Sequence, residues 1–267
     1  MAMEVHGATK TFACAVVGIS RNSLVPPVAR KSSDPVLRRW LRLFARKNPR
    51  WGWRKAYWML RNKDLVINHK RVRRLWREEG LCRKRKARSQ RCQKPQVKVH
   101  AAFPNHVWAL DFQFDQTTDG RVIKFLNVID EFTRESLVSI VARSITNEDV
   151  RHVLADLIRA RGAAPRFLRS DNGSEFAAHD LVAWLKDNGV TNAFIAPASP
   201  WQNGKAESYN GIFRDELLNM ELFESVEHAQ HLTNTWKHTY NHFRPHGSLK
   251  GATPAAFAAT HTNQPGL

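Results

Sequence analysis

Three acidic residues, widely separated along the chain, are the strongest candidates for chemistry. Asp111 interrupts an apolar strand-like run and shares a face with Val107 and Ala109, where an unpaired charge would cost free energy. Asp171 follows a short apolar segment, and open α/β sheets place their sites at such strand ends. Glu207 falls in the first turn of an expected helix. Joint chemistry requires that the fold bring these three carboxylates together.

A divalent cation is the partner that three converging carboxylates favour. Like charges repel at close range unless a cation neutralises them, and oxygen ligands without a nearby His or Cys favour Mg²⁺ or Mn²⁺ over zinc. The spacing supports this interpretation, because 59 residues separate Asp111 from Asp171 and 35 separate Asp171 from Glu207. Each acid also has an ordinary interpretation, since an Asp in an Asp-Asn-Gly sequence is usually a turn former.

Other acids lie near the first of these residues. Asp115 shares the strand and face of Asp111, and Asp130 and Glu131 end the next expected strand. None of them has the spacing of the three candidates. We therefore expect turn or ion-pair roles for them, with Arg134 as a candidate partner.

Three histidines, His238, His242 and His246, are four residues apart and could suggest zinc. Pro245 cannot continue a helix, so we expect His246 to leave the stripe formed by the other two. The favoured interpretation is a helix surface followed by a turn.

The sequence pattern around the acids predicts a mixed sheet that would position them. Three strand patterns joined by short connections predict an antiparallel meander, and helix and strand patterns then alternate. This order predicts an α/β domain with helices on both faces of the sheet. The expected elements are strands His106–Phe114, Val122–Ile129, Ser136–Ala142, Arg166–Ser170 and Asn192–Ile195, and helices Asn147–Arg161, His179–Lys186 and one beginning near Gln202.

The first hundred residues carry the positive charge of the chain. They hold 27 Lys and Arg against 5 Asp and Glu, whereas the remainder holds 15 against 19, and this asymmetry favours nucleic acid as a partner. Helices are expected from Pro35 to Asn48, over Trp53–Arg61, and from the N-cap Asn68 to Glu79. Two short helices with a basic second one suit a helix-turn-helix, and a helical bundle with a solvated basic face is the alternative. The candidate DNA contacts are Asn68, His69, Lys70, Arg71, Arg73, Arg74 and Arg77.

Residues 81–99 contain eight Lys and Arg and no acid, which is typical of a linker that follows a phosphate backbone. A flexible solvated spacer is the alternative, and it is compatible with ordering on DNA. The candidate contacts here are Arg83, Lys84, Arg85 and Lys86.

The remaining composition excludes several classes of protein. Three cysteines without a C-x-x-C pair argue against a disulfide framework and a zinc module, and they suit a reducing compartment. The longest uncharged apolar run, Phe12–Ile19, is too short to cross a membrane, although it could start a small helix that Asn22–Pro27 breaks. We expect no signal peptide and no membrane anchor.

Seven segments together resemble a known family. The chain is similar to the transposase encoded by the second reading frame of bacterial insertion sequences, in the retroviral-integrase superfamily. The resemblance extends over residues 11–258. It rests on Trp51–Lys55, Asn68–Val72, Trp108–Phe112, Asp130–Glu135, Arg169–Phe176, Gln202–Gly211 and Tyr240–His246.

The resemblance implies a ribonuclease H-like fold and a catalytic triad of Asp111, Asp171 and Glu207. It also implies two Mg²⁺ or Mn²⁺ ions, cleavage of transposon DNA ends and strand transfer into target DNA. A homo-oligomer on DNA, the first-reading-frame protein as a partner, and a bacterial cytoplasmic location at the nucleoid are further implications. A ribonuclease H-like hydrolytic nuclease and a non-catalytic, transposon-derived DNA-binding protein remain as alternatives.

Helical spacing adds residues around the triad. Asn203, Glu207, Asn210 and Arg214 would share one helix face, so the two Asn side chains should flank the scissile strand and Arg214 could meet a phosphate. Lys205 lies off that face and could contact DNA elsewhere. Plain surface polarity is the alternative for all four neighbours of Glu207.

The expected division of the chain has five parts. They are an N-terminal segment (1–33), a helix-turn-helix domain (34–80), a basic linker (81–100), the catalytic core (101–222) and a C-terminal helix and tail packed on the core (223–267).

Overall fold

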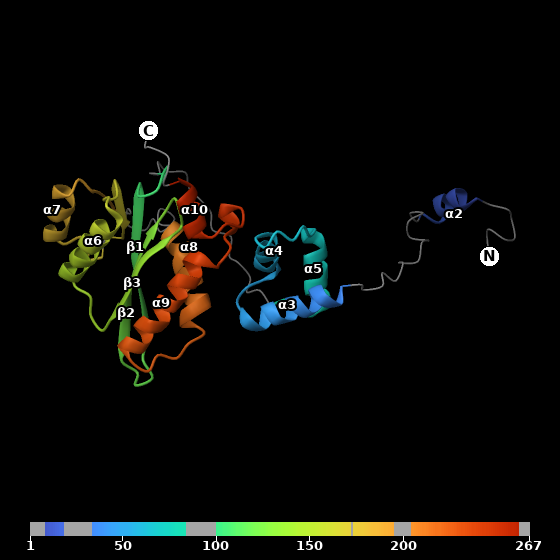
Figure 1. The fold of residues 1–267 in the computed structure, drawn as a ribbon, viewed down its shortest axis with the longest axis horizontal. Helices are drawn as coiled ribbons and strands as arrows, with labels where there is room; N and C mark the ends of the chain where they lie inside the picture. The colour runs from blue at the N-terminus through green and yellow to red at the C-terminus, as the bar shows by residue number, and fades with distance from the viewer. Residues whose placement is uncertain (1–8, 19–33, 84–99, 172, 195–203, 262–267) are drawn as a thin grey trace. The chain divides into compact units, whose positions relative to one another are not determined.

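The chain from residue 107 onward is built around a five-stranded mixed sheet (Figure 1). Its strand order is β3-β2-β1-β4-β5, in which β1 pairs antiparallel with β2, β2 antiparallel with β3, and β1, β4 and β5 run parallel. The antiparallel meander and the mixed α/β sheet predicted from the sequence are thus confirmed. The strands are β1 (Val107–Gln116), β2 (Val122–Asp130), β3 (Ser136–Ala142), β4 (Phe167–Ser170) and β5 (Thr191–Phe194).

The structure is a computed structural model that describes residues 9–18, 34–83, 100–171, 173–194 and 204–261. It divides into two units, Met1–Leu43 and Phe44–Leu267. The predicted DNA contacts Lys84, Arg85, Lys86 and Asn203 lie outside the described residues.

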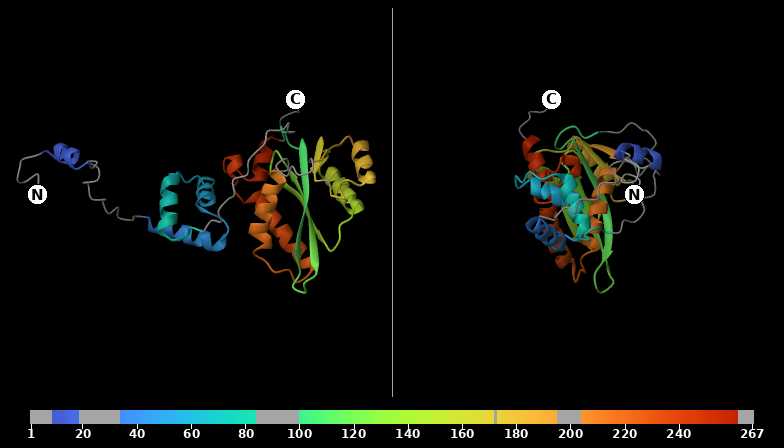
Figure 2. Two further views of the ribbon diagram at one scale, coloured as in Figure 1. Left: turned by 180° about the vertical axis from the view of Figure 1, so that it is seen from behind. Right: turned by 90° about the vertical axis from the view of Figure 1, so that its right-hand side faces the viewer.

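Helices pack on both faces of the sheet, as Figures 1 and 2 show. α6 (Asn147–Arg161) and α7 (His179–Asp187) lie on one face, and α8 (Gly204–Phe213) and α9 (Val226–His242) lie on the other. α6 begins with a capping box in which Thr146 and Asp149 bond each other's backbone N–H. The sequence predicted α6 to the residue.

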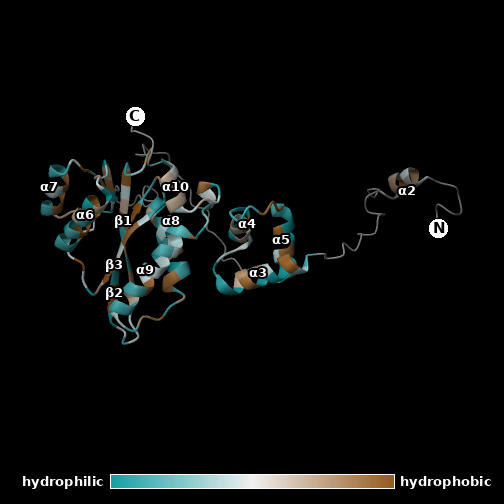
Figure 3. Cartoon of the chain, in the orientation of Figure 1, coloured by the Kyte–Doolittle hydropathy of each residue, from teal (hydrophilic) through white to brown (hydrophobic). Residues whose placement is uncertain are grey.

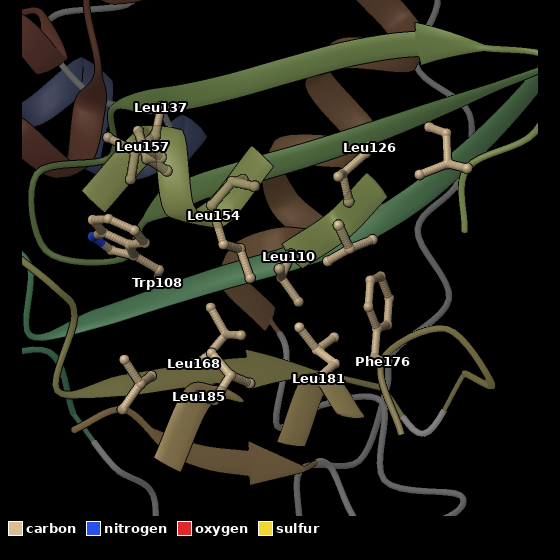
Figure 4. Packing of buried hydrophobic residues seen from close by; sticks show 14 residues of the cluster. Trp108, Leu110, Leu126, Leu137, Leu154, Leu157, Leu168, Phe176, Leu181 and Leu185 are labelled. Carbon is tan, nitrogen blue, oxygen red and sulfur yellow. The ribbon is translucent and has the colours of Figure 1, made fainter. Parts of the chain in front are cut away.

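Side-chain alternation along β1 assigns each residue to one of two cores. Trp108 and Leu110 point into the cluster under α6 and α7, which Figure 4 shows from close by. Ala109 belongs to the second cluster, with Tyr209 and Phe213 of α8. Asp111 therefore faces α8, the helix that carries Glu207.

The chain after α8 is irregular at one turn. A single π-helical segment, η3 (Arg214–Leu218), continues α8, and π-turns inside helices often occur at functional sites. A short 3-10 turn, η4 (Gly247–Leu249), and α10 (Pro254–His261) follow α9. Among the described helices, none is both long enough and apolar enough to cross a membrane.

The basic front of the chain folds as short helices. α2 (Lys10–Val17) lies in the first unit, α4 (Trp53–Arg61) and α5 (His69–Glu78) lie in the second, and α3 (Pro35–Lys47) crosses the boundary. Asn68 caps α5 as predicted, its side chain accepting the Lys70 N–H at 2.8 Å. α5 buries Val72, Leu75 and Trp76 on one side, and Figure 3 shows both hydrophobic and hydrophilic residues along its ribbon.

Candidate active site

Asp111 is held on both of its carboxylate oxygens. It lies in the middle of β1, opposite Asn127 of β2, and is half-buried. Its Oδ1 accepts the Phe112 N–H at 2.8 Å, and its Oδ2 accepts the side-chain amide of Asn210 at 2.7 Å. Hydrogen bonds from two donors fix the orientation of this half-buried carboxylate, which suits a metal ligand or a catalytic group.

Asp171 stands directly after β4, in the parallel half of the sheet. Its Oδ1 accepts the Gly173 N–H at 3.0 Å, and a Cβ at Gly173 would lie only 3.0 Å from that oxygen. Glycine thus lets the backbone approach the carboxylate closely. The side chain itself is exposed, as a group that meets a substrate must be.

The segment after Asp171 is anchored on the strands next to Asp111. Lys124 of β2 forms an ion pair with Glu175 and lies 3.7 Å from the centroid of the Phe112 ring. Phe176 stacks on the same ring at 4.6 Å. Hydrogen bonds, the one from Lys124 first and then the one from Ser174, lower the pKa of Glu175 to about 2, so this carboxylate stays ionised near neutral pH. These contacts give structural roles to Glu175 and Phe176, which follow the Asp-Asn-Gly sequence.

Glu207 reaches the site from the first turn of α8. The buried residues Ala206 and Tyr209 pack α8 against the sheet, which leaves Glu207 and Asn210 beside β1. The side chain of Gln113 donates to the Asn210 carbonyl at 3.0 Å and helps to fix this contact between helix and strand.

The three carboxylates interact through their charges. Burial, together with the charges of Asp171 and Glu207, raises the pKa of Asp111 to about 6, against the hydrogen bonds from Phe112 and Asn210, which lower it. In the part of the chain that the structure describes, no three His, Cys, Asp or Glu side chains are grouped closely enough to hold a metal ion. The donor set nevertheless fits Mg²⁺ or Mn²⁺, because it offers carboxylate oxygens whose mutual repulsion a cation would relieve.

The raised pKa predicts that Asp111→Asn stabilises the metal-free protein. The folded-state pKa lies above the ordinary value of 3.8 for Asp, so ionised Asp111 destabilises the fold at high pH, and that penalty disappears as the pH falls through 6 toward 4. Two-state unfolding in EDTA should show the variant more stable by about 1–3 kcal/mol at pH 8 and equal to wild type near pH 3.5. Equal stabilities at pH 8 would contradict the electrostatic description of this site.

The competing acids have structural partners. Asp115 accepts a hydrogen bond from the next backbone N–H, and Asp130 accepts three backbone N–H groups at 2.6 to 3.0 Å. Glu131 pairs with Arg169 at 2.5 Å, whereas the sequence suggested Arg134. β4 lies beside β1, so this partner depends on strand order rather than on proximity in sequence.

The histidine stripe ends as predicted. His238 and His242 are exposed on α9 with ring centroids 4.7 Å apart, and α9 ends at His242. His246 is buried elsewhere, where burial and the charges of Arg244 and Lys55 lower its pKa to about 3. It is therefore a neutral side chain at neutral pH.

The predicted DNA contacts that are described fall into two groups. Five are exposed on α5: His69, Lys70, Arg71, Arg73 and Arg77. The second group comprises Asn68, Arg74 and Arg83 and the predicted contacts in α8 and η3. Asn68 is the α5 cap, Arg74 pairs with Glu78 at 3.4 Å, and Arg83 pairs with Asp215 at 3.2 Å.

The predicted contacts near Glu207 also differ in their surroundings. Asn210 bonds Asp111, and Lys205 is exposed in the first turn of α8. Arg214 is exposed and donates to the Phe114 carbonyl at 3.1 Å, which ties the first residue of η3 to β1.

Sequence reasoning assigned no role to Tyr240–His246, and the structure supplies one. Arg244 forms a two-pronged ion pair with Glu216, at 2.8 and 2.9 Å, in which each side chain is only 7% exposed. The same carboxylate accepts a hydrogen bond from Lys55 Nζ of α4 at 3.1 Å. It also accepts one from Nε1 of Trp51, which lies just before α4, at 3.0 Å. Burial alone would raise the pKa of Glu216, but Arg244 and Lys55 hold it below its ordinary value. No spacing rule links these four residues.

Comparison with known proteins places these features in one family. Two models of the integrase core domain match residues 101–200 and 188–254, and a model of an HTH-like domain matches residues 33–89. The chain is 37% identical over 251 residues to the insertion element IS407 uncharacterized 31.7 kDa protein of Burkholderia multivorans, a match that covers 93% of this chain and 90% of that protein.

Other proteins of insertion elements are also similar to this chain. The chain is 36% identical to the insertion element IS476 uncharacterized 39.2 kDa protein of Xanthomonas euvesicatoria, over 94% of this chain and 73% of that one. It is 27% identical to Transposase InsD for insertion element IS2D of Escherichia coli, over 78% and 73%.

A solved structure shares the fold. A chain of the simian T-cell lymphotropic virus intasome in complex with PP2A regulatory subunit B56 gamma superposes with a TM-score of 0.52. The match covers 84% of this chain and 76% of that chain at 16% sequence identity. This likeness and the observed sheet confirm the predicted ribonuclease H-like fold.

Proposed function

The chain belongs to the integrase-core family of insertion-element proteins, and from this premise we propose that it is a DDE transposase. In this proposal it cleaves the DNA ends of its insertion sequence and joins them to target DNA. Asp111, Asp171 and Glu207 are its catalytic acids and its metal ligands. The family itself is a family of DNA-processing proteins; the triad, the metal and the joining reaction are what we propose.

The observation that carries the proposal is that Asp111 of β1 lies within electrostatic reach of two other carboxylates, Asp171 directly after β4 and Glu207 of α8. Asp111 feels the charges of both Asp171 and Glu207, although all three lie far apart in sequence. A fold gains no stability from such repulsion. Proteins concentrate perturbed carboxylates where chemistry requires them.

The residues of the chain have defined tasks in this reaction. When bound, two Mg²⁺ or Mn²⁺ ions would supply the charge stabilisation that an in-line displacement at phosphorus needs. The triad would hold them, and Asn210 would fix the orientation of the Asp111 carboxylate. Neither cleavage nor joining requires a covalent bond to the protein. Water is the nucleophile in cleavage, and the 3′-hydroxyl that cleavage frees is the nucleophile in joining.

DNA contact is assigned to the basic surfaces. The exposed cations of α5 suit major-groove and phosphate contacts, and the basic linker, with Lys84, Arg85 and Lys86, suits the phosphate backbone. Asn203 and Asn210 would flank the strand to be cut, Arg214 would meet a phosphate, and Lys205 would contact DNA elsewhere.

Assembly completes the proposal. We expect a homo-oligomer on DNA, with the first-reading-frame protein of the element as a candidate partner. We also propose the five-part division of the chain described above. We further propose a bacterial cytoplasmic location at the nucleoid.

A strand-transfer assay tests the function directly. A pre-cleaved oligonucleotide end with a 3′-hydroxyl is incubated with the full chain, Mg²⁺ and a target plasmid, with and without the first-frame protein. Covalently joined product supports the transposase. Cleavage without joining would favour the hydrolytic nuclease, and DNA binding without metal-dependent turnover would favour the non-catalytic protein.

A further inference from the structure

A row of polar side chains crosses the sheet at the level of Asp111. The strand register places Asp111 opposite Asn127 and Asn127 opposite Ser139, so the three residues lie side by side on β1, β2 and β3. All three face α8. Asn127 and Ser139 are at most 2% exposed.

The other residues of β2 on this face are apolar. Ile123, Phe125 and Ile129 are the other residues of β2 that pack there, against Phe213 of α8. Burying polar groups in such surroundings costs free energy unless every one is hydrogen-bonded. A complete polar row at this position therefore calls for an explanation beyond packing.

Hydrogen bonds connect the row to the catalytic carboxylate. Ser139 Oγ donates to Asn127 Oδ1 at 2.8 Å, Asn127 Nδ2 donates to Asn210 Oδ1 at 3.4 Å, and Asn210 Nδ2 donates to Asp111 Oδ2 at 2.7 Å. Behind them, the Tyr209 hydroxyl lies 3.2 Å from Ser139 Oγ and 2.7 Å from Ser136 Oγ.

The chain of bonds has one direction. Because the Ser139 proton is used on Asn127, Ser139 accepts from Tyr209, and Tyr209 can accept from Ser136 in turn. Each amide then has one orientation. If the Asn210 amide were reversed, its oxygen would face the Asp111 carboxylate, and two acceptors would oppose each other.

We propose that Asn127, Ser139 and Tyr209 are positioning residues for Asp111, acting through the side-chain amide of Asn210. They would hold that amide with its NH₂ toward the carboxylate and so fix one ligand of the metal site. The inference rests on the proposed function, since Asp111 needs a fixed orientation only if it binds metal. Partners of metal ligands in other proteins typically contribute 10–100-fold in metal affinity or activity.

Ser139→Ala tests the proposal, because it removes one buried hydroxyl and little volume. Two readouts are made on the full chain without DNA. One is the Mg²⁺ concentration that gives a half-maximal thermal shift. The other is the ¹⁵N side-chain amide resonance of Asn210 in the metal-free protein. Ser139→Thr, which retains a hydroxyl, is the conservative variant, and Tyr240→Phe is the control, since Tyr240 lies in the same cluster outside the bonded row.

The expected results are specific. Ser139→Ala should raise the required Mg²⁺ concentration roughly tenfold and shift or broaden the Asn210 amide signal. Ser139→Thr and Tyr240→Phe should stay within about twofold of wild type. The proposal is overturned if Ser139→Ala matches wild type in both readouts, or if Tyr240→Phe loses as much Mg²⁺ affinity as Ser139→Ala.

The proposed function can fail separately. If the wild-type protein joins DNA ends while Ser139→Ala is unchanged, only the positioning role is wrong. If wild type shows neither cleavage nor joining, the function is wrong whatever the Asn210 amide does.

Discussion

Asp171→Asn and Glu207→Gln should each reduce Mg²⁺-dependent cleavage and joining by a factor on the order of 10³ or more. Each substitution removes a charged oxygen ligand, and losing several kcal/mol of transition-state stabilisation gives a rate decrease of this size. Neither residue lies in α5 or the basic linker, so DNA binding should be unchanged. A radiolabelled end-cleavage assay and a gel-shift measurement at fixed salt would show both results.

Asp115→Asn is the matched control for these variants. It removes a carboxylate from the strand and face that carry Asp111, but Asp115 is absent from the charges that raise the pKa of Asp111. Cleavage should stay within a few-fold of wild type. A loss as deep as that of Asp171→Asn would mean that the triad has been wrongly assigned.

Glu216→Gln should lower the free energy of unfolding by about 3–5 kcal/mol. The substitution leaves the buried Arg244 and the nearby Lys55 without their shared counter-ion, and removing one partner of a buried ion pair costs this much. Urea denaturation followed by tryptophan fluorescence measures the change, with Trp51 as one reporter beside Glu216.

The neighbouring Asp215→Asn provides the comparison. Asp215 is 41% exposed, and it pairs with Arg50 at 3.4 Å and Arg83 at 3.2 Å at the surface. Such pairs contribute less than about 1 kcal/mol. Equal losses for the two variants would show that burial of the Glu216 pair does not matter.

Much of the fold could be predicted because it depends on local signals. Periodicity located β3 and α6 to the residue, and Asn68 and Gly80 marked the ends of α5. Alternation along β1 predicted that Asp111 shares a face with Val107 and Ala109, and the structure adds that α8 covers the face of Ala109. Helical spacing also grouped Asn210 with Glu207, and the structure adds that Asn210 bonds Asp111.

The remaining features depend on tertiary contacts that leave no local signal. The row Asp111–Asn127–Ser139 follows from the register of three strands, and a shift of one residue would remove it. Glu216 meets Arg244 through the turn after α9, 28 residues further along the chain. The π-turn at Arg214 likewise departs from the regular helix that the spacing argument assumed.

Crystals of the full chain soaked in Mn²⁺, with anomalous diffraction recorded near the manganese edge, would show where the metal binds. If the triad is the metal site, anomalous peaks should lie between the carboxylates of Asp111, Asp171 and Glu207 and should be lost in Asp171→Asn. Manganese bound only at other side chains, with these three acids unligated, would contradict that assignment.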